Sequence, residues 1–429
     1  MKRVLLVLLA FCFCAAGLTV AATAAGNAYV IQNPYADVDW ETWGTYKANL
    51  HVHTTFSDGD YCLRDMVEEY YRRGFDVLGT TDHMVVGRPW DQKPRTVPPF
   101  DIQNWGKPHD VLSTNRLQEI TEGVGRGGRG MVQVPKGLEM NGVVPMKSHV
   151  NGFFAGWGQA FLGVDNDFRT AVAMTEKYGG VSFINHPGDW LHSENDLSVA
   201  RDPANVNYFA DILRDYPSCL GIEIYNDGDY PTRGDRVLWD ELLTRLLPEG
   251  RQVWGFANDD SHNYNSVDNT SELMFMPKNT VENIRACMET GAFLACSRYD
   301  RIRLGDFAGD KNLPFPSVTN ITVNQAAGTI TLQTTGTDLV EWVADGKVIA
   351  TGGTIDLAAH AEEMTCYVRA QLIGPGGISA TQAFGLDDGT GGKHPDDALH
   401  GWAWVKWRVT LMFRKNIFTW LLRAISERI

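Results

Sequence analysis

Histidines and carboxylates recur at the ends of apolar, strand-like segments of this chain. His51 and His53 close the first such segment, and Asp260 and His262 follow the last. In an extended strand, residues i and i+2 point to the same face, so each pair aims its two side chains together. Imidazole nitrogens and carboxylate oxygens are the ligand set that zinc, iron and manganese accept. The spacing therefore predicts a hydrolase that uses several metal ions.

Further candidates lie between these two pairs. His83 follows the second apolar segment, Glu139 ends the third, His149 begins the fourth and His186 follows the fifth. Any one of these histidines is more often a structural residue than a ligand. Taken together they favour a metal site, because bringing several such side chains close together is unfavourable without a cation between them.

The elements that must position these residues are short. Between residues 46 and 305, apolar segments alternate with amphipathic ones, which predicts parallel βα units. Seven units whose strands end in polar residues predict an α/β barrel with its chemistry at the carboxyl ends of the strands. We expect strands over 47–53, 75–80, 131–140, 148–155, 180–185, 219–225 and 252–258, and helices over 63–73, 165–178, 207–215, 236–247 and 280–290.

The segment 84–130 interrupts this alternation. It carries five prolines and a glycine-rich stretch at 123–130. A connection of this length inside a compact domain is usually functional or disordered. Because it directly follows a strand that ends in a candidate ligand, we expect it to cover the pocket.

The chain changes character after residue 310. Short segments rich in Thr and Val, with a hairpin signal at Asp345-Gly346, predict a small β-sandwich with Trp342 in its core. After a linker over 385–397, residues 402–429 predict a helix with six basic residues and only Glu427 to oppose them. Such a helix either lies on an anionic membrane surface or packs against the acidic barrel.

Composition limits the classes of function and partner. The net charge of −14 disfavours a protein that binds nucleic-acid backbones. It does not exclude an anionic substrate, because bound metals reverse the local field. Five cysteines lie beyond Cys14 without CxxC spacing, which predicts buried free thiols and neither a disulfide framework nor a thiolate metal site. The oligomeric state stays open.

The N-terminus has the pattern of an export signal. Met1-Lys2-Arg3 is a basic start, an apolar run extends to Ala16, and Ala22-Thr23-Ala24 fits a cleavage site. We therefore expect a signal peptide over 1–24 and a secreted or periplasmic protein. The alternative is an N-terminal membrane anchor.

Six motifs resemble, in order, those of the PHP (polymerase and histidinol phosphatase) metallohydrolase family over roughly residues 46–305. They are HVHTTFSDG, TDH, GLEMNG, SHVNGFF, NHP and DDSH. With the signal and the β-sandwich, the chain is also similar to a secreted, carbaryl-hydrolase-like branch. The resemblance implies a distorted seven-stranded βα barrel. The expected domains are a signal peptide (1–24), the barrel (40–308), an Ig-like β-sandwich (315–388) and a basic amphipathic helix (398–429).

The resemblance also implies how two to three divalent ions (Zn, Mn or Fe) would be held. The first ion would be held by His51, His53, Glu139 and Asp260, and Glu139 would bridge to a second held by His149 and His186. A third would be held by Asp58, His83 and His262, with Asp58 standing where some members use histidine. Glu139 and Asp260 would be the catalytic residues.

Clustered ions indicate the reaction. They lower the pKa of bound water to about 7, so a hydroxide bridging two of them is a nucleophile at neutral pH. The predicted function is a phosphoesterase acting on a small phosphomonoester or phosphodiester. The alternative is hydrolysis of carboxylic esters, amides or carbamates, since the ligand set does not choose between phosphorus and carbon. Asp82 and Asp259 are interpreted as residues that orient ligands. Arg88, Lys147 and Arg233 are either anion contacts or surface charges.

Overall fold

The computed structural model describes residues 29–142, 148–163, 167–305, 307–390 and 401–414. The predicted signal peptide at 1–24 lies outside the described residues, as does the end of the predicted C-terminal helix. Within the described ranges, every helix is too short or too polar to cross a bilayer.

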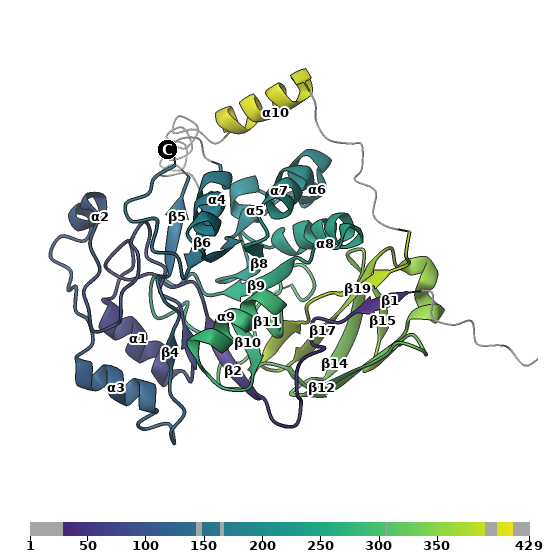
Figure 1. The fold of residues 1–429 in the computed structure, drawn as a ribbon, viewed down its shortest axis with the longest axis horizontal. Coiled ribbons are helices and arrows are strands. Elements are labelled where there is room, and N and C mark those ends of the chain that lie inside the picture. The colour runs from purple at the N-terminus through teal and green to yellow at the C-terminus, as the bar shows by residue number, and fades with distance from the viewer. Residues whose placement is uncertain (1–28, 143–147, 164–166, 306, 391–400, 415–429) are drawn as a thin grey trace, which may run out of the picture.

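The first sheet is built around β2 (Gly44–Asn49). On one side β2 pairs in parallel with β3 (Val77–Leu78), which pairs in parallel with β4 (Val132–Gln133). On the other side β2 pairs antiparallel with β10 (Thr270–Met276), which pairs with β11 (Phe293–Ser297). The sequence analysis did not predict β10 or β11. Figure 1 shows these strands in the lower part of the molecule.

The second sheet has five strands in chain order. The first three pair antiparallel and the last three in parallel: β5 (Leu138–Asn141), β6 (His149–Phe153), β7 (Val181–Ile184), β8 (Cys219–Asn226) and β9 (Trp254–Asn258). The predicted helices are present as α1 (Leu63–Arg72), α4 (Arg169–Lys177), α7 (Pro203–Asp215), α8 (Asp235–Leu246) and α9 (Val281–Thr290). Helices α4, α7 and α8 pack on this sheet. Shorter helices are α2 (Pro98–Gln103), α3 (Thr114–Glu122), α5 (Pro187–Leu191) and α6 (Ser198–Arg201).

The two sheets meet at single bridges. Val52 bridges Ser261, and His83 bridges Glu139. The described strands therefore form a mixed α/β fold with several sheets, not the closed seven-stranded βα barrel that the resemblance implied. The reason is that β10 occupies the edge of β2 on which a closed barrel would place β9.

The predicted strand at 131–140 is two strands. Pro135 has no N–H to donate to a ladder, and Lys136 adopts a positive φ of 57°. Gly137 follows in close contact, because a Cβ there would lie 2.5 Å from the carbonyl oxygen of Thr80. This break assigns β4 to the first sheet and β5 to the second, so Glu139 belongs to a strand of the second sheet.

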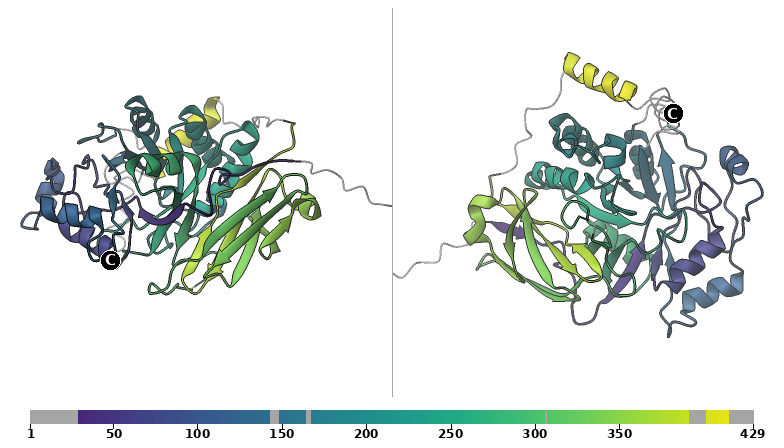
Figure 2. Two further views of the ribbon diagram at one scale, coloured as in Figure 1. Left: turned by 60° about the horizontal axis from the view of Figure 1, so that its bottom comes forward. Right: turned by 180° about the vertical axis from the view of Figure 1, so that it is seen from behind.

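The C-terminal part contains a two-layered β-sandwich (Figure 2). One layer is the antiparallel sheet of β12 (Ser317–Asn324), β13 (Thr329–Thr335) and β16 (Thr354–Asp356). The other layer is formed by five further strands of this part of the chain. Trp342 is fully buried, as predicted. The strands of the second layer are β14 (Leu339–Ala344), β15 (Lys347–Thr351), β17 (Tyr367–Gly374), β18 (Gly377–Ala380) and β19 (Phe384–Asp387).

The sandwich continues the first sheet. β18 pairs with β11 on one side and with β17 on the other, so one sheet passes from β2 into the sandwich. β19 pairs in turn with β1 (Val30–Gln32). The expected limits at 40–308 and 315–388 therefore separate segments that share a sheet, and as domain limits they stay predictions.

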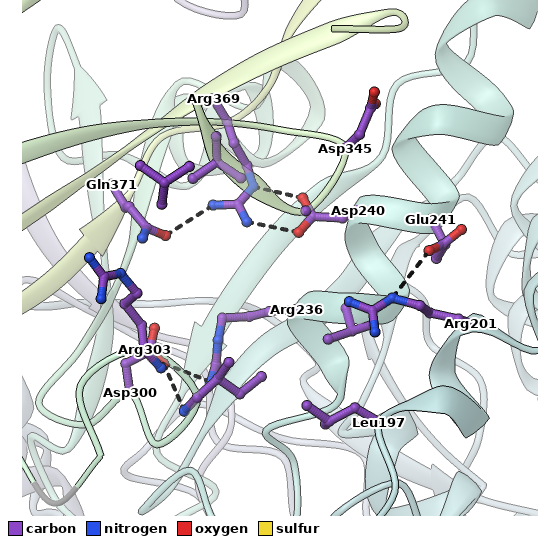
Figure 3. Close-up of a pocket in the computed structure, with 15 residues that line it drawn as sticks. Leu197, Arg201, Arg236, Asp240, Glu241, Asp300, Arg303, Asp345, Arg369 and Gln371 are labelled. Atoms are coloured by element: carbon purple, nitrogen blue, oxygen red, sulfur yellow. Dashed lines mark hydrogen bonds and ion pairs between the residues drawn. The ribbon is translucent and has the colours of Figure 1, made fainter. Parts of the chain in front are cut away.

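Buried ion pairs fasten α8 to the sandwich (Figure 3). Arg369 on β17 lies with its Nε 2.8 Å from Oδ1 of Asp240 on α8, and the Tyr367 hydroxyl donates to the same oxygen at 2.8 Å. Arg236 on α8 donates to Asp300 at 3.1 Å. Because each buried charge has a partner, removing one partner would leave the other charge buried and unpaired. These contacts fix α8, and with it β8, in place.

The cysteines and the C-terminal helix complete the description. All five described cysteines are buried and free, as predicted. Helix α10 (Gly401–Arg414) covers part of the predicted 398–429 helix. Its Trp407 packs against Tyr208 of α7 with ring centroids 5.3 Å apart, whereas Trp402 is 80% exposed. The helix thus touches the rest of the fold through Trp407.

Candidate metal centre

His51 and His53 lie just beyond the end of β2, in extended chain that is fixed from both sides. The Val52 amide donates to Thr81 Oγ1 at 3.0 Å, and the His53 amide donates to the Ser261 carbonyl at 3.0 Å. The bonds tie the segment to the ends of β3 and β9. Both imidazoles are fully buried on the same side of this segment.

Two imidazoles and two carboxylates converge at the centre of the site. His51 Nε2 and His53 Nε2 are 3.1 Å apart. Glu139 places Oε1 3.3 Å from the first and Oε2 3.2 Å from the second. Asp260 Oδ1 lies 3.2 Å and 3.1 Å from the same two nitrogens.

Glu139 also faces three further histidines. Its Oε2 is 3.0 Å from His83 Nδ1, and its Oε1 is 3.0 Å from His149 Nδ1 and 3.4 Å from His186 Nε2. The carboxylate is 1% exposed. Glu139 is therefore the centre of the cluster, in contact with imidazoles from both sheets.

A third set lies nearer to solvent. Asp58 has carboxylate oxygens 3.5 Å from His53 Nδ1, 3.5 Å from His83 Nε2 and 3.3 Å from His262 Nε2. The rings of His53 and His262 stack with centroids 4.2 Å apart. The His262 side chain is 36% exposed, so this side of the cluster faces the opening.

The structure brings all nine predicted residues together. Their donor atoms form four overlapping groups, and in each group the atoms lie within 4.8 Å of one another. The groups are His53, Asp58, His83 and His262; His51, His53 and Glu139; His51, His186 and Asp260; and His83, Glu139 and His149. His53 belongs to two groups, so the geometry is more shared than the resemblance implied. The role of each residue as a ligand stays a prediction.

Three buried atoms show that the cluster suits a cation. Glu139 Oε2, His149 Nδ1 and His186 Nδ1 make no hydrogen bond of normal geometry, although Oε2 and His149 Nδ1 each have an oppositely charged or ionisable neighbour at 3.0 Å. Leaving such a buried polar atom unsatisfied costs about 1–3 kcal/mol. A divalent cation would satisfy Glu139 Oε2, and a mixture of nitrogen and carboxylate oxygen donors suits zinc, iron or manganese. The residues present therefore fit bound divalent ions.

The carboxylates and imidazoles shift one another's pKa values. Burial alone would lower the pKa of His51, but the carboxylates of Asp260, Glu139 and Glu223 outweigh burial and raise it well above its usual range. Burial would raise the pKa of Glu139, but His149 and other imidazoles lower it far below. In the metal-free centre the raised pKa of His51 favours its protonated form, so a metal that binds there must displace a proton and binds more tightly as pH rises.

His262 follows the same logic at the open side. Burial would lower its pKa, but hydrogen bonding to Asp58 and the charge of Asp260 raise the pKa of His262 to about 9. The pKa of Asp58 is correspondingly low: burial would raise it, and His83 and His262 reverse that effect.

Glu223 on β8 supports the centre and was not predicted from the sequence. Its Oε1 lies 2.9 Å from His51 Nδ1, the ring nitrogen that faces away from Glu139. Its Oε2 accepts from the His186 amide and from Asn226 Nδ2, both at 3.0 Å. A carboxylate on the outer nitrogen of a ligating histidine fixes its tautomer and orientation. In the sequence Glu223 is only a glutamate between two isoleucines, which ordinary strand alternation also explains, whereas the structure shows it fully buried.

Two asparagines were also missed. Asn141 Oδ1 lies 3.0 Å from His83 Nδ1, and its Nδ2 lies 3.1 Å from His149 Nε2. Asn185 Nδ2 donates to Glu139 Oε1 at 2.7 Å. Both follow or precede a predicted ligand in sequence, but an asparagine there is also common in turns.

Asp82 and Asp259 hold backbone next to the cluster. Asp82 accepts from the Thr54 amide at 2.7 Å, beside His53. Asp259 accepts from the Thr270 amide at 2.8 Å, at the start of β10. Among the described residues, neither belongs to a group that could hold a metal. Their contacts agree with the interpretation that they orient the ligand segments.

The segment 84–130 contacts the site through α2. Phe100 stacks against His83 with centroids 6.1 Å apart, and Asn104 Nδ2 donates to the carbonyl oxygens of Thr55 and Ser57. The segment thus covers the side of the cluster where Asp58 lies, as the sequence analysis expected.

The candidate anion contacts differ in their surroundings. Arg88 is exposed, and Lys147 lies outside the described residues. Arg233 follows β8 and stacks over Tyr230 at 5.7 Å, and its buried Nε has no hydrogen-bond partner. Of the described candidates, only Arg233 is partly buried near the carboxyl end of a site strand.

Comparison with known sequences gives a short match. No protein-family model matches the chain. A stretch of 40 residues is 40% identical to the DNA polymerase/3'-5' exonuclease PolX of Bacillus subtilis (strain 168). It makes up 9% of this chain and only 7% of that protein, so the chain spans a small part of this curated relative.

Comparison with solved structures gives distant likenesses. One is a two-domain protein from Bacteroides vulgatus described as containing a predicted PHP-like metal-dependent phosphoesterase. It is 19% identical to this chain and has a TM-score of 0.39. The match covers 83% of this chain and 90% of that chain. Another is the lesion-specific endonuclease PfuEndoQ from Pyrococcus furiosus, 12% identical, with 60% of each chain covered and a TM-score of 0.35. These values are too low to carry an argument about activity, which has to come from the site itself.

Proposed function

We propose that this chain is a metal-dependent phosphoesterase of the PHP type that hydrolyses a small phosphomonoester or phosphodiester. The observation that carries the proposal is Glu139, a buried carboxylate in contact with five imidazoles and with one oxygen that no hydrogen bond satisfies. Bound divalent ions supply Lewis acidity and lower the pKa of a coordinated water to about 7. The order of the six PHP-like motifs supports the same function.

The chain's own residues would orient the ions and admit the substrate. Glu223 holds the outer nitrogen of His51, and Asn141 contacts His83 Nδ1 beside Glu139. The buried strands β5, β7, β8 and β9 enclose the inner side of the cluster, and helix α2 covers part of the side where Asp58 lies. The substrate would enter beside His262, the most exposed of the predicted ligands.

The same donor set would serve an alternative reaction. Hydrolysis of carboxylic esters, amides or carbamates is the second candidate, in keeping with the resemblance to carbaryl-hydrolase-like proteins. A nucleic-acid substrate is disfavoured by the net charge of −14. It belongs in the test nonetheless, because one of the similar structures is an endonuclease.

The test combines metal analysis with a substrate panel. The full chain, purified without chelator, is analysed for Zn, Mn and Fe, and we expect two to three ions per chain. Turnover of an aryl phosphate, a bis-aryl phosphodiester, an aryl ester, an aryl carbamate and single-stranded DNA is then compared. Faster turnover of the aryl ester or carbamate than of both phosphates would replace the proposal with the alternative. Less than one transition metal per chain would overturn both.

We further propose that residues 1–24 direct export. The basic start, the apolar run and the small residues before Ala25 support this. Expression of the full chain in a bacterial host should yield periplasmic protein whose N-terminus lies near Ala25. Protein that stays in the cytoplasm, or that keeps Met1 in the membrane fraction, would contradict the proposal.

A further inference from the structure

A cavity separate from the metal cluster lies where the first sheet meets the β-sandwich. It has a volume of about 620 Å³, within the roughly 300–1,000 Å³ that is usual for small-molecule sites. Residues from β2, β10 and β12 line it, together with the segment 311–315. β2 and β12 lie at the lower edge of Figure 1. Lys47 of β2 lines this cavity, whereas the metal cluster begins four residues later, about 13 Å along an extended chain.

The cavity is cationic in an acidic protein. Only two acidic residues, Asp39 and Asp268, line it. The five basic residues that line it are Lys47, Arg73, Arg129, Arg298 and Lys311. The whole chain carries a net charge of −14, so this concentration of positive charge is local. Clefts lined by one sign of charge raise the local concentration of ligands of the opposite sign.

Most of these cations have a carboxylate partner, but Lys311 does not. Lys47 and Arg298 share Asp268, at 2.6 Å and 3.2 Å. Lys311 Nζ donates only to the carbonyl oxygens of Asn265 and Val267, at 3.0 Å and 2.9 Å. Within the described residues, no carboxylate lies at ion-pair distance from Lys311. Its ammonium group has three protons, so one is left for a ligand.

The electrostatic surroundings of Lys311 point in the same direction. Burial lowers the pKa of Lys311, and the guanidinium groups of Arg73 and Arg298 lower it further, although Asp259 and Asp268 oppose them. An anion bound among these cations would relieve their mutual repulsion.

Aromatic rings line the cavity among the cations, and Arg298 lies over the ring of Phe315 at 3.7 Å. Trp40 and Trp43 are half-buried and line it with Phe275 and Phe315. Trp40 packs edge-on against Phe275 with centroids 5.0 Å apart. For Trp43, the structure records no aromatic partner among the described residues. Trp43 packs partly against the core and is half-exposed where it lines the cavity, so a flat apolar group in the cavity would contact it beside the cations. Aromatic pairs are favourable by about 0.5–1.5 kcal/mol beyond area burial.

We propose that this cavity binds a small organic anion with a flat apolar body, of the class of aromatic carboxylates, at a site separate from the metal cluster. The carboxylate would lie at Lys311 and the ring on Trp43. The site does not depend on the phosphoesterase proposal, because it shares no residue with the nine predicted ligands.

The experiment is calorimetric titration of the full chain with 2-naphthoate, with neutral 2-naphthamide as the shape control. We expect one saturable site for the carboxylate and much weaker binding of the amide. Replacing Lys311→Met should raise Kd at least about tenfold, the equivalent of one lost charge-assisted hydrogen bond. Lys311→Arg should restore binding, and Trp43→Ala should weaken it.

Two control variants distinguish binding in this cavity from binding at the metal centre or at the general surface. Lys278→Met removes an exposed lysine outside the cavity and should leave Kd unchanged. Glu139→Gln alters the metal cluster and should also leave Kd unchanged. Binding that is lost in Glu139→Gln would place the ligand at the metal centre instead. Binding that is absent at roughly 5 mM ligand, or equal in wild type and Lys311→Met, would overturn the proposal.

Discussion

Glu223→Gln is the change that most directly tests how the centre is supported. The Glu223 carboxylate faces four nitrogen atoms: His51 Nδ1 at 2.9 Å, and the His186 amide, Asn226 Nδ2 and Asn258 Nδ2, each at 3.0 Å. A glutamine offers one oxygen and one NH2 group. Two of the four nitrogens would then lose their acceptor and face an N–H.

The size of the effect follows from these contacts. A hydrogen bond to a charged group contributes about 1.5–3 kcal/mol, so losing two gives an upper limit of about 3–6 kcal/mol in unfolding free energy. That is a large part of the roughly 5–15 kcal/mol of a typical domain. Metal affinity should fall about 10–100-fold, as for other residues that hold a ligating histidine.

A matched control is available in the same core. Glu272 on β10 is as buried as Glu223, and burial raises its pKa well above the usual range, which favours its neutral form. Glu272→Gln therefore replaces one neutral group by another and should leave metal affinity unchanged. Metal affinity is measured by competition with a chromophoric chelator, and stability by urea unfolding of the metal-free protein. Wild-type metal affinity in Glu223→Gln, or equal losses in the two variants, would refute the supporting role.

Three further predictions follow from the same geometry. Glu139→Gln should reduce turnover far more than Asp58→Ala, because Glu139 faces five imidazoles. The control is Glu122→Gln, at an exposed position. Equal losses of turnover in Glu139→Gln and Asp58→Ala would argue against a central Glu139. For the metal-free protein, a His262 pKa of about 9, raised from an ordinary 6.5, gives stability that is fully present below about pH 6.5 and is lost as pH rises through 9. A thermal-melting series in EDTA should show this decline in wild type and less of it in His262→Gln. If the basic C-terminal helix binds membranes, a chain ending at Asp388 should stay active but lose co-sedimentation with anionic liposomes at low salt. The attraction to anionic headgroups is roughly 1 kcal/mol per basic residue. A lower melting temperature without any effect on liposome binding would favour packing of the helix on the fold instead.

The sequence predicted the site better than the fold. The nine candidate ligands stand in short motifs, and local spacing is enough to recognise these. The prediction of a closed barrel was wrong because it did not include β10 and β11. Their apolar segments follow the last motif, and nothing local in Thr270–Met276 shows that this strand pairs antiparallel with β2, more than 200 residues earlier. Strand order is a long-range property, whereas periodicity reports only which face of a strand is buried.

The residues missed at the site share one property. Glu223, Asn141 and Asn185 lie within or just beyond strands, where a single polar residue looks like ordinary alternation. Their partners are distant in sequence: Glu223 contacts His51 across 172 positions, and Asn185 contacts Glu139 across 46. A residue that binds a metal directly can be recognised by its type and spacing. A residue that only orients such a ligand is identified by the fold that brings the two together. For this reason a ligand motif can be recognised before the topology is known, and the carboxylate that orients the ligand cannot.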